Sequence, residues 1–324
     1  MTKILLSELD KSLPKGKFIL FVGLGFDERS LSVLKNIGAS SPHKIFGLLN
    51  PVRIGTPQTN YQEKFLEISG AGAEIIGSDC SSIIEAVDVV QARLQNVDMV
   101  DVDLVIDITS LTHELLVALI GLLASEDLLS RVTLLYTGAA EYSFNTSDEQ
   151  AWLSRGVVEI RSVLGFPGIM LPSKKLHLII MAGFEIERAV EVIRRYEPAT
   201  LTIGYGSKLH SVSEKHHNAN KGFAAEIETL LTQQDGMSND LHHFEFSCVD
   251  PYATKEDLMS YISQAQNENI VICPLNTKLS TVGAALAALE LPHVQICYAQ
   301  PAEYNVSGYA KPGESVTVTH LDKN

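Results

Sequence analysis

Two stretches of the sequence combine glycine with a charged side chain at a spacing that suits anion binding. Gly25 and Phe26 precede Arg29, and Gly183 precedes Arg188 in a second, similar stretch. Each arginine falls in the first turn of an expected helix, where a positive charge opposes the helix dipole. The sequence therefore favours an anionic partner for each arginine. That partner is either a bound ligand or a neighbouring carboxylate.

Two further stretches place hydroxyl, amide and basic side chains where a helix is expected to begin. Hydroxyl and amide side chains at this position cap the first backbone amides of a helix. The same amides can instead hold a phosphate. The residues concerned are Thr109, Ser110, Thr112 and His113 in the first stretch, and Asn276, Thr277 and Lys278 in the second. Lys278 adds positive charge, and His113 can transfer a proton. An ungapped comparison sets His113 opposite Leu279, which favours a packing role for His113.

The sequence lacks the residues that several common types of binding site require. A dinucleotide fingerprint needs a third glycine where Glu28 stands, and an acid at the next strand end, where Asn50 stands. The 4 cysteines are far apart and form no C-x-x-C pair. His216 and His217 have no cysteine or glutamate at a metal-binding spacing. We therefore predict no cofactor, no metal site and no catalytic residue.

Net charge and the length of apolar runs argue against several classes of protein. The chain has 324 residues with 25 Lys+Arg and 39 Asp+Glu, which gives a formal net charge of −14. This acidity argues against general nucleic-acid binding. The longest apolar run, 115–124, is too short to cross a bilayer. Residues 1–13 lack the apolar core of a signal peptide. The expected location is the cytoplasm, with no membrane partner.

The sequence contains an internal duplication. Four segments of the first half recur in the same order in the second half, which chance does not readily produce. The pairs are FILFVGLGFDERSLSVL with LHLIIMAGFEIERAVEVI, NYQEKF with NANKGF, VIDITSLTHELLVALIGLLA with VICPLNTKLSTVGAALAALE, and LYTGAAEYSFN with CYAQPAEYNVS.

Each copy alternates short apolar runs with helical patterns, which predicts an α/β fold. The expected strands are 18–23, 44–49, 73–77, 103–108, 131–137 and 157–162 in the first copy, with 176–182, 200–204, 243–248, 269–273, 293–298 and 315–320 in the second. This order predicts two duplicated Rossmann-like domains, each with a doubly wound parallel sheet. We place the domains at 1–166 and 173–324. The linker is 165–174, which is rich in glycine and proline.

The duplicated loops have a predicted place in this fold. Doubly wound sheets bind ligands beyond the carboxyl ends of their strands, where the strand order reverses. With the order 3-2-1-4-5, the loops that follow strands one and four face each other at that point. These are the loops that contain the residues named above. We therefore predict one ligand-binding edge in each domain.

The tandem Rossmann arrangement, together with Asp107-Ile-Thr-Ser-Leu-Thr112 and, more loosely, Asn276-Thr277-Lys278, resembles CARF domains. The fused two-copy form is similar to SAVED domains. Both are sensors in CRISPR-linked or related antiphage systems, and such families bind cyclic oligonucleotides between two Rossmann units. The resemblance implies antiviral defence and a nucleotide-like ligand held by these two loops. The sequence departs from the family at Thr112, where a basic residue is frequent.

Three functions stay open at this point. The first is a ligand-sensing module that binds a nucleotide-like anion and acts through a protein effector partner. The second is a nucleotide-processing enzyme such as a ring nuclease, with Ser110, Thr112, His113 and Lys278 as candidates. The third is an assembly subunit without a small ligand. A homo-oligomer is compatible with each of them.

Overall fold

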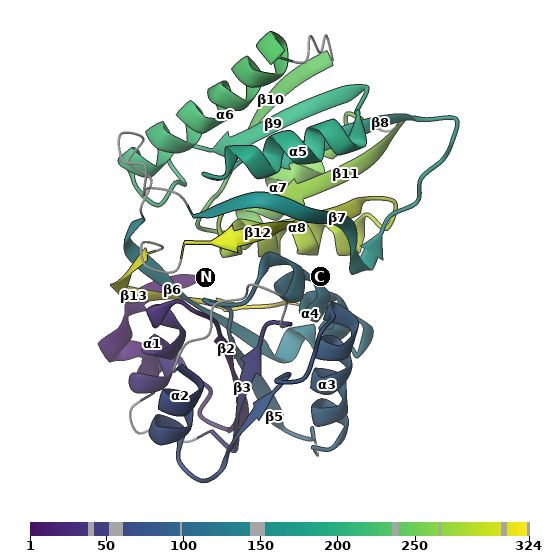
Figure 1. Cartoon of the computed structure of the whole chain (residues 1–324). Coiled ribbons are helices and arrows are strands. Elements are labelled where there is room, and N and C mark those ends of the chain that lie inside the picture. Colours follow the sequence, from purple (N-terminus) through teal and green to yellow (C-terminus); the bar gives the residue numbers. More distant parts are fainter. Residues whose placement is uncertain are drawn as a thin grey trace. The chain divides into compact units, whose positions relative to one another are not determined.

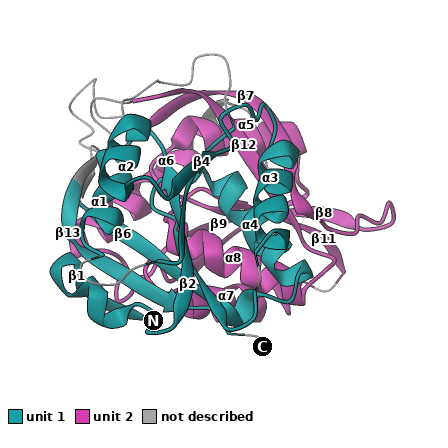
Figure 2. Ribbon diagram, turned by 90° about the horizontal axis from the view of Figure 1, so that it is seen from below, with its two compact units in different colours: residues 1–143, 306–324 teal, residues 144–305 magenta. Residues whose placement is uncertain are grey.

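The chain forms two compact units, each built around one β-sheet (Figures 1 and 2). Unit 1 comprises Met1–Ser143 and Val306–Asn324, and unit 2 comprises Phe144–Asn305. The computed structural model describes residues 1–37, 42–51, 61–97, 99–142, 153–234, 240–265, 267–305 and 310–322. Each unit is described below by itself.

The sheet of unit 1 has the strand order β1-β13-β6-β5-β2-β3-β4. Its strands are β1 (Thr2–Leu5), β13 (Ala310–His320), β6 (Val132–Tyr142), β5 (Val102–Asp107), β2 (Lys17–Leu24), β3 (Lys44–Leu49) and β4 (Ala73–Ile76). The five strands from β6 to β4 are parallel, whereas β13 is antiparallel to both of its neighbours. In chain order the parallel strands read 3-2-1-4-5, as predicted.

The sheet of unit 2 repeats this order as β10-β9-β8-β11-β12-β7. Its strands are β10 (Asp240–Phe246), β9 (Thr200–Gly206), β8 (Lys175–Met181), β11 (Glu268–Pro274), β12 (Gln295–Tyr304) and β7 (Ser154–Pro167). All neighbours are parallel except β7, which is antiparallel to β12. The predicted fold class, two Rossmann-like units with doubly wound sheets, is confirmed, although both sheets are mixed rather than wholly parallel because β13 and β7 are antiparallel to their neighbours.

The last strand of each half of the sequence pairs with a strand from the other half. Strand β7 extends into the glycine- and proline-rich stretch 165–174 and pairs with β12 in unit 2 (Figure 1). Strand β13 ends the second half but pairs with β6 in unit 1. The predicted domains 1–166 and 173–324, with a linker at 165–174, therefore differ from the compact units. The two units divide the chain after residues 143 and 305, so that β7 belongs to unit 2 and β13 to unit 1.

Helices cover both faces of each sheet. Unit 1 contains η1 (Leu6–Ser12), η2 (Glu28–Leu31), α1 (Ser32–Lys35), α2 (Tyr61–Ser69), α3 (Ile83–Gln95), α4 (His113–Ser125) and η3 (Leu129–Arg131). Unit 2 contains α5 (Ile186–Tyr196), α6 (Glu214–Gln234), α7 (Pro251–Ile262) and α8 (Lys278–Glu290). The helix predicted after the first strand is only a 3-10 turn and a short α-helix in unit 1.

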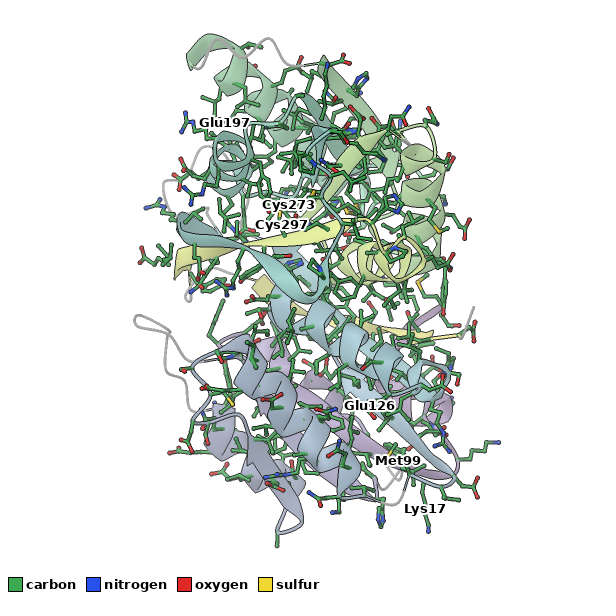
Figure 3. All side chains as sticks on the ribbon, turned by 90° about the vertical axis from the view of Figure 1, so that its right-hand side faces the viewer. Lys17, Met99, Glu126, Glu197, Cys273 and Cys297 are labelled. Carbon is green, nitrogen blue, oxygen red and sulfur yellow. The ribbon has the colours of Figure 1, made fainter. Side chains whose placement is uncertain are left out.

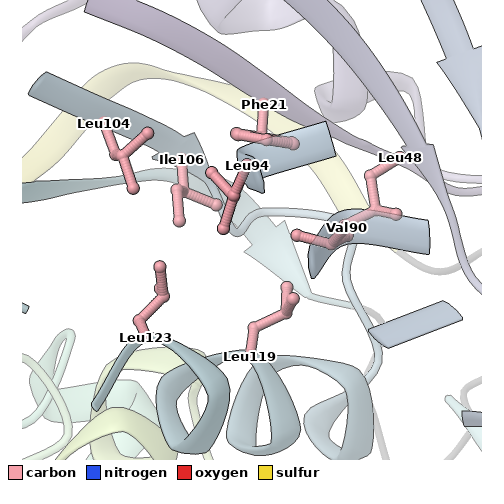
Figure 4. A pocket seen from close by; sticks show the side chains of 8 residues that line it. All are labelled: Phe21, Leu48, Val90, Leu94, Leu104, Ile106, Leu119 and Leu123. Atoms are coloured by element: carbon pink, nitrogen blue, oxygen red, sulfur yellow. The ribbon is translucent and has the colours of Figure 1, made fainter. Parts of the chain in front are cut away.

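The cores pack differently in the two units. In unit 1 a small cavity lies between the sheet, α3 and α4, and all of its lining side chains are apolar (Figure 4). They are Phe21, Leu48, Val90, Leu94, Leu104, Ile106, Leu119 and Leu123. In unit 2 helices α7 and α8 pack closely, since a Cβ on Gly283 would lie 2.5 Å from the Pro251 carbonyl oxygen. Small residues therefore bring the helices together in unit 2.

Candidate functional site

The loops after the first and fourth strands meet in both units, as the strand order predicts. Gly25 follows β2, and a Cβ there would lie 3.0 Å from both the Cβ and the carbonyl oxygen of Ser110, which follows β5. Gly183 is closer still, because its Cβ would lie 1.9 Å from the Leu275 carbonyl oxygen. Only glycine tolerates this approach at Gly183. The predicted site residues thus lie at the carboxyl ends of the parallel strands in each sheet.

An asparagine fastens these loops together in unit 1. Asn50, directly after β3, donates from Nδ2 to the carbonyl oxygens of Ser110 at 2.9 Å and Leu24 at 3.4 Å. Its Oδ1 accepts from the backbone amide of Thr112 at 2.7 Å. Asn50 therefore joins the ends of three strands. From the sequence alone, Asn50 is only a residue that does not fit ribose binding.

Two asparagines join the corresponding loops in unit 2. Asn220, on α6, donates to the carbonyl oxygens of Ala182 at 2.6 Å and Gly183 at 3.1 Å. Asn276 donates to the same Ala182 oxygen at 2.5 Å and accepts from the backbone amide of Thr277 at 2.8 Å. Asn276 also donates to Asn220 Oδ1 at 3.2 Å. These contacts fix the loop from which α8 begins.

The two central helices begin in the same way. Thr112 caps α4 by accepting from the Leu115 amide at 3.2 Å, and Thr277 caps α8 by accepting from the Ser280 amide at 3.1 Å. The first helical residues are therefore His113 and Lys278. The ungapped comparison that set His113 opposite Leu279 is wrong by one residue, because the loop of unit 2 is shorter. Each helix thus starts with a half-buried basic side chain.

The two predicted arginines bind their own chain. Arg29 is 3% exposed, pairs with the Asp27 carboxylate through Nε at 2.8 Å, and donates to the Thr137 carbonyl at 3.3 Å. Arg188 pairs with Glu185 at 2.5 Å and donates from Nε to the Ala299 carbonyl at 3.0 Å. Of the two sequence interpretations, the structure has the neighbouring carboxylate as partner. Each arginine joins the loop after the first strand to the fifth strand.

The charge of Arg188 is well supported in this setting. Burial opposes it, but the Glu185 carboxylate, together with Tyr298, Tyr304 and Cys273, more than offsets that effect, so the pKa of Arg188 lies above its usual value. The guanidinium also lies over the Tyr298 ring, 5.6 Å from its centroid. The arginine is therefore a fixed ionic clamp within unit 2.

A buried polar cluster lies beneath the switch point of unit 1. Asp107 is fully buried at the end of β5, where Oδ1 accepts from the Thr109 amide at 3.0 Å and from its hydroxyl at 2.5 Å. The Thr109 hydroxyl in turn accepts from the Thr137 amide at 2.9 Å. Asp107 Oδ2 has no hydrogen-bond partner among the described residues. Burial raises the pKa of Asp107 to about 7, although Thr109 and Arg29 act against the shift.

The corresponding positions in unit 2 are apolar. Strand pairing sets Asp107 opposite Val22 in unit 1 and Cys273 opposite Ile180 in unit 2. Cys273 and Cys297 lie side by side in this core (Figure 3), both at most 1% exposed. Cys273 therefore stands in unit 2 where unit 1 has the Asp107 carboxylate.

The phenylalanines of the first loop pack against the chain. Phe26 is half-buried beside Gly25. The Phe184 ring makes edge contacts with His216 at 5.0 Å and Phe223 at 5.5 Å between ring centroids. Burial, and then the neighbouring His217, lower the pKa of His216 to about 4, so this ring is neutral at physiological pH. The sequence alone assigns no role to His216, because its ring contact is with Phe184, on a different loop.

The described residues form neither a clustered metal site nor a membrane-spanning helix. Within the described ranges, no three His, Cys, Asp or Glu side chains are grouped to hold a metal ion. In the same part of the chain, no helix combines the length and the apolar character needed to cross a membrane. Neither a protein-family model nor a curated protein sequence matches the chain.

Proposed function

We propose that the chain is a ligand-sensing module that binds a nucleotide-like anion at the carboxyl end of the unit 2 sheet. The observation that carries this proposal is the start of α8. Lys278 is its first residue, at the switch point of a doubly wound sheet, on a loop fixed by Asn276 and Thr277. A helix start attracts anions through its backbone amides, and a lysine there adds a full positive charge.

Unit 2 suits an anion better than unit 1. In unit 1 the helix start is His113 followed by a buried carboxylate, Glu114, and Asp107 lies beneath the loop. In unit 2 the same positions hold Lys278, Leu279 and Cys273. Negative side chains near a bound phosphate repel it. The proposed site is therefore the start of α8 rather than the start of α4.

The resemblance to CARF and SAVED domains supports a more specific proposal. On that basis the anion is a cyclic oligonucleotide, and the protein takes part in antiviral defence through a protein effector partner. This step rests on the short motifs Asp107 to Thr112 and Asn276 to Lys278, and on the tandem fold.

Equilibrium binding tests the proposal. The protein is titrated with cyclic oligonucleotides, linear oligonucleotides and mononucleotides, and each affinity is compared with that of Lys278→Glu. Loss of a charge-assisted contact costs about 1.5–3 kcal/mol, so we expect binding to weaken about 10- to 100-fold. The control is Lys175→Glu, the same charge change on an exposed residue at the opposite end of β8. Equal effects from both variants, or no binding to any nucleotide, would contradict the proposal.

A nucleotide-processing enzyme is the second candidate. His113 stands at the helix position that Lys278 occupies in unit 2, so a proton-transfer group lies at a switch point. We expect binding without turnover when the protein is incubated with cyclic oligonucleotides and the products are separated by chromatography. Multiple turnovers that disappear in His113→Ala would favour the ring-nuclease function instead.

A further inference from the structure

A chain of polar side chains crosses the amino-terminal half of the unit 2 sheet, away from the proposed anion site. His177, on β8, contacts Glu268 Oε2 through Nδ1 at 2.8 Å and Thr202 Oγ1 through Nε2 at 2.7 Å. The same Thr202 hydroxyl contacts the Tyr261 hydroxyl on α7 at 2.8 Å. Four elements, β11, β8, β9 and α7, are therefore joined by three consecutive hydrogen bonds.

Two of the side chains in this hydrogen-bond chain are buried, which raises the cost of breaking it. His177 is 3% exposed and Thr202 is fully buried, whereas the Glu268 side chain is 23% exposed. A buried hydroxyl or imidazole that loses its partner costs far more than an exposed one. Tyr261 also stacks on Phe244 of β10, with 4.9 Å between ring centroids, so the hydroxyl contact is one of two that join this ring to the sheet.

The other half of the duplication shows that the fold does not require these groups. Strand pairing sets Phe46 of unit 1 at the position of Thr202, and Val102 at the position of Glu268. The repeat sets Ile19 at the position of His177. All three counterparts are apolar. Unit 2 therefore holds a titratable chain where its duplicate has ordinary core.

The hydrogen-bond chain has one consistent direction when His177 is neutral. Nδ1–H donates to Glu268, which requires Nε2 to accept from the Thr202 hydroxyl. Thr202 Oγ1 then accepts from the Tyr261 hydroxyl. Glu268 Oε1 also accepts from the Thr200 hydroxyl at 2.5 Å, which holds the carboxylate in place.

We propose that this Glu268–His177–Thr202–Tyr261 chain is a pH-responsive latch that fastens α7 to the unit 2 sheet. When Nε2 of His177 takes up a proton, both ring nitrogens become donors. Thr202 must then accept from Nε2 and turn its own proton toward the Tyr261 oxygen. The Tyr261 hydroxyl proton loses Thr202 as its acceptor, so the contact that joins α7 to the sheet reverses and weakens.

The charges around His177 set the pH at which the latch opens. Burial lowers the pKa of His177 and Glu268 acts in the opposite direction, with smaller effects from His242 and Asp240 on β10. His242 and Asp240 pair with each other at 3.2 Å. With a pKa below its unfolded value of about 6.5, His177 binds a proton more weakly in the folded state. Its stabilising effect is thus complete above that pH and declines as the pH falls below it.

Imidazole NMR and hydrogen exchange test the latch. Nitrogen-15 spectra of the histidine rings report the tautomer and pKa of His177 directly. We expect the proton on Nδ1 at neutral pH and a pKa below 6.5. Exchange of the α7 amides, corrected for the intrinsic effect of pH, should rise severalfold as His177 is protonated. A proton on Nε2 at neutral pH would overturn the proposal.

Two variants separate a latch from a merely structural network. In Tyr261→Phe, α7 exchange should already be raised at pH 7.5 and should show no further step, while the ring of His177 still titrates. In His177→Gln the step should be absent. The control is His243→Gln, which removes an exposed histidine that contacts Glu228 at 3.5 Å on the same unit. A step that persists in Tyr261→Phe, or that disappears in His243→Gln, would contradict the latch.

Discussion

Units 1 and 2 share a framework but differ in where they bury polar chemistry. Both use asparagines to close the switch-point loops, a threonine to cap the central helix, and an arginine to bind the fifth strand. Beneath these loops, unit 1 has Asp107 and unit 2 has Cys273. On the opposite sheet face, unit 2 has His177, whereas unit 1 has Ile19.

The difference indicates which features the fold requires. Contacts present in both units hold loops and strand ends in place, so they are structural. Contacts present in one unit are not needed for the fold, since the other unit folds without them. The buried carboxylate of unit 1 and the histidine chain of unit 2 are therefore the places to look for function or regulation, along with Lys278 at the start of α8, where unit 1 has His113.

The largest effect is expected from breaking an arginine clamp. Arg29→Met leaves the buried Asp27 carboxylate without its ionic partner, with only the backbone amide of residue 29 still donating to it, which should lower the free energy of unfolding by about 3–5 kcal/mol. Arg188→Met should cost less, because the side chain of Glu185 is 10% exposed, compared with 6% for Asp27. Urea unfolding measures both, and a double variant Arg29→Met/Asp27→Asn should recover part of the loss. A larger loss from Arg188→Met would reverse the comparison.

The second effect concerns the glycines of the first loop. Gly183→Ala forces a Cβ to 1.9 Å from the Leu275 carbonyl oxygen, whereas in Gly25→Ala the nearest atoms lie at 3.0 Å. We expect about 3 kcal/mol of destabilisation for the first and about 1 kcal/mol for the second. Thermal unfolding of both variants gives the ratio. Equal losses would show that the loop of unit 2 relaxes as readily as that of unit 1.

The third effect depends on pH and belongs to unit 1 alone. With its pKa raised to about 7, Asp107 binds a proton more tightly when folded, so stability declines as pH rises from about 4 to about 7. Asp107→Asn removes this decline and should be more stable than the wild type at pH 8, by roughly 2 kcal/mol. The test is the unfolding free energy at pH 5 and pH 8. An Asn variant that is less stable at pH 8 would show that the carboxylate is satisfied when charged.

The smallest effect comes from the helix caps. Thr112→Ala removes one cap and should cost about 1 kcal/mol. Thr277→Ala should cost about 1 kcal/mol more, because its hydroxyl also donates to the buried Cys248 carbonyl at 2.6 Å. Denaturant midpoints with matched Ser replacements as controls measure the difference. Similar costs at the two caps would indicate that the extra bond in unit 2 contributes nothing.

Much of the fold follows from the sequence. Strand β3 is an apolar run after its first residue, Lys44, and the repeat shows that both halves share one order. The exchange of β7 and β13 does not follow. An apolar alternation predicts a strand, but it does not say which of two similar sheets the strand joins. The linker was therefore assigned from glycine and proline alone.

The sequence predicts where the candidate site lies, but it does not predict which partners its side chains bind. The switch-point rule locates Gly25, Ser110 and Asn276 at the carboxyl ends of the strands, where they lie. It does not say that the arginines turn inward, because their partners include carbonyls of a strand more than a hundred residues away in sequence. The contact between His177 and Thr202 likewise depends on the pairing of β8 with β9, which no local pattern specifies.

The most direct test of the account is a titration with inorganic pyrophosphate, followed by backbone amide chemical shifts. The account predicts saturable shifts at the start of α8, at Thr277, Lys278 and Leu279, and much smaller shifts at Thr112, His113 and Glu114 in unit 1. The shifts at α8 should be lost in Lys278→Glu and retained in Lys175→Glu. Saturable shifts confined to the start of α4, or no saturable shift at either helix, would contradict an anion site in unit 2.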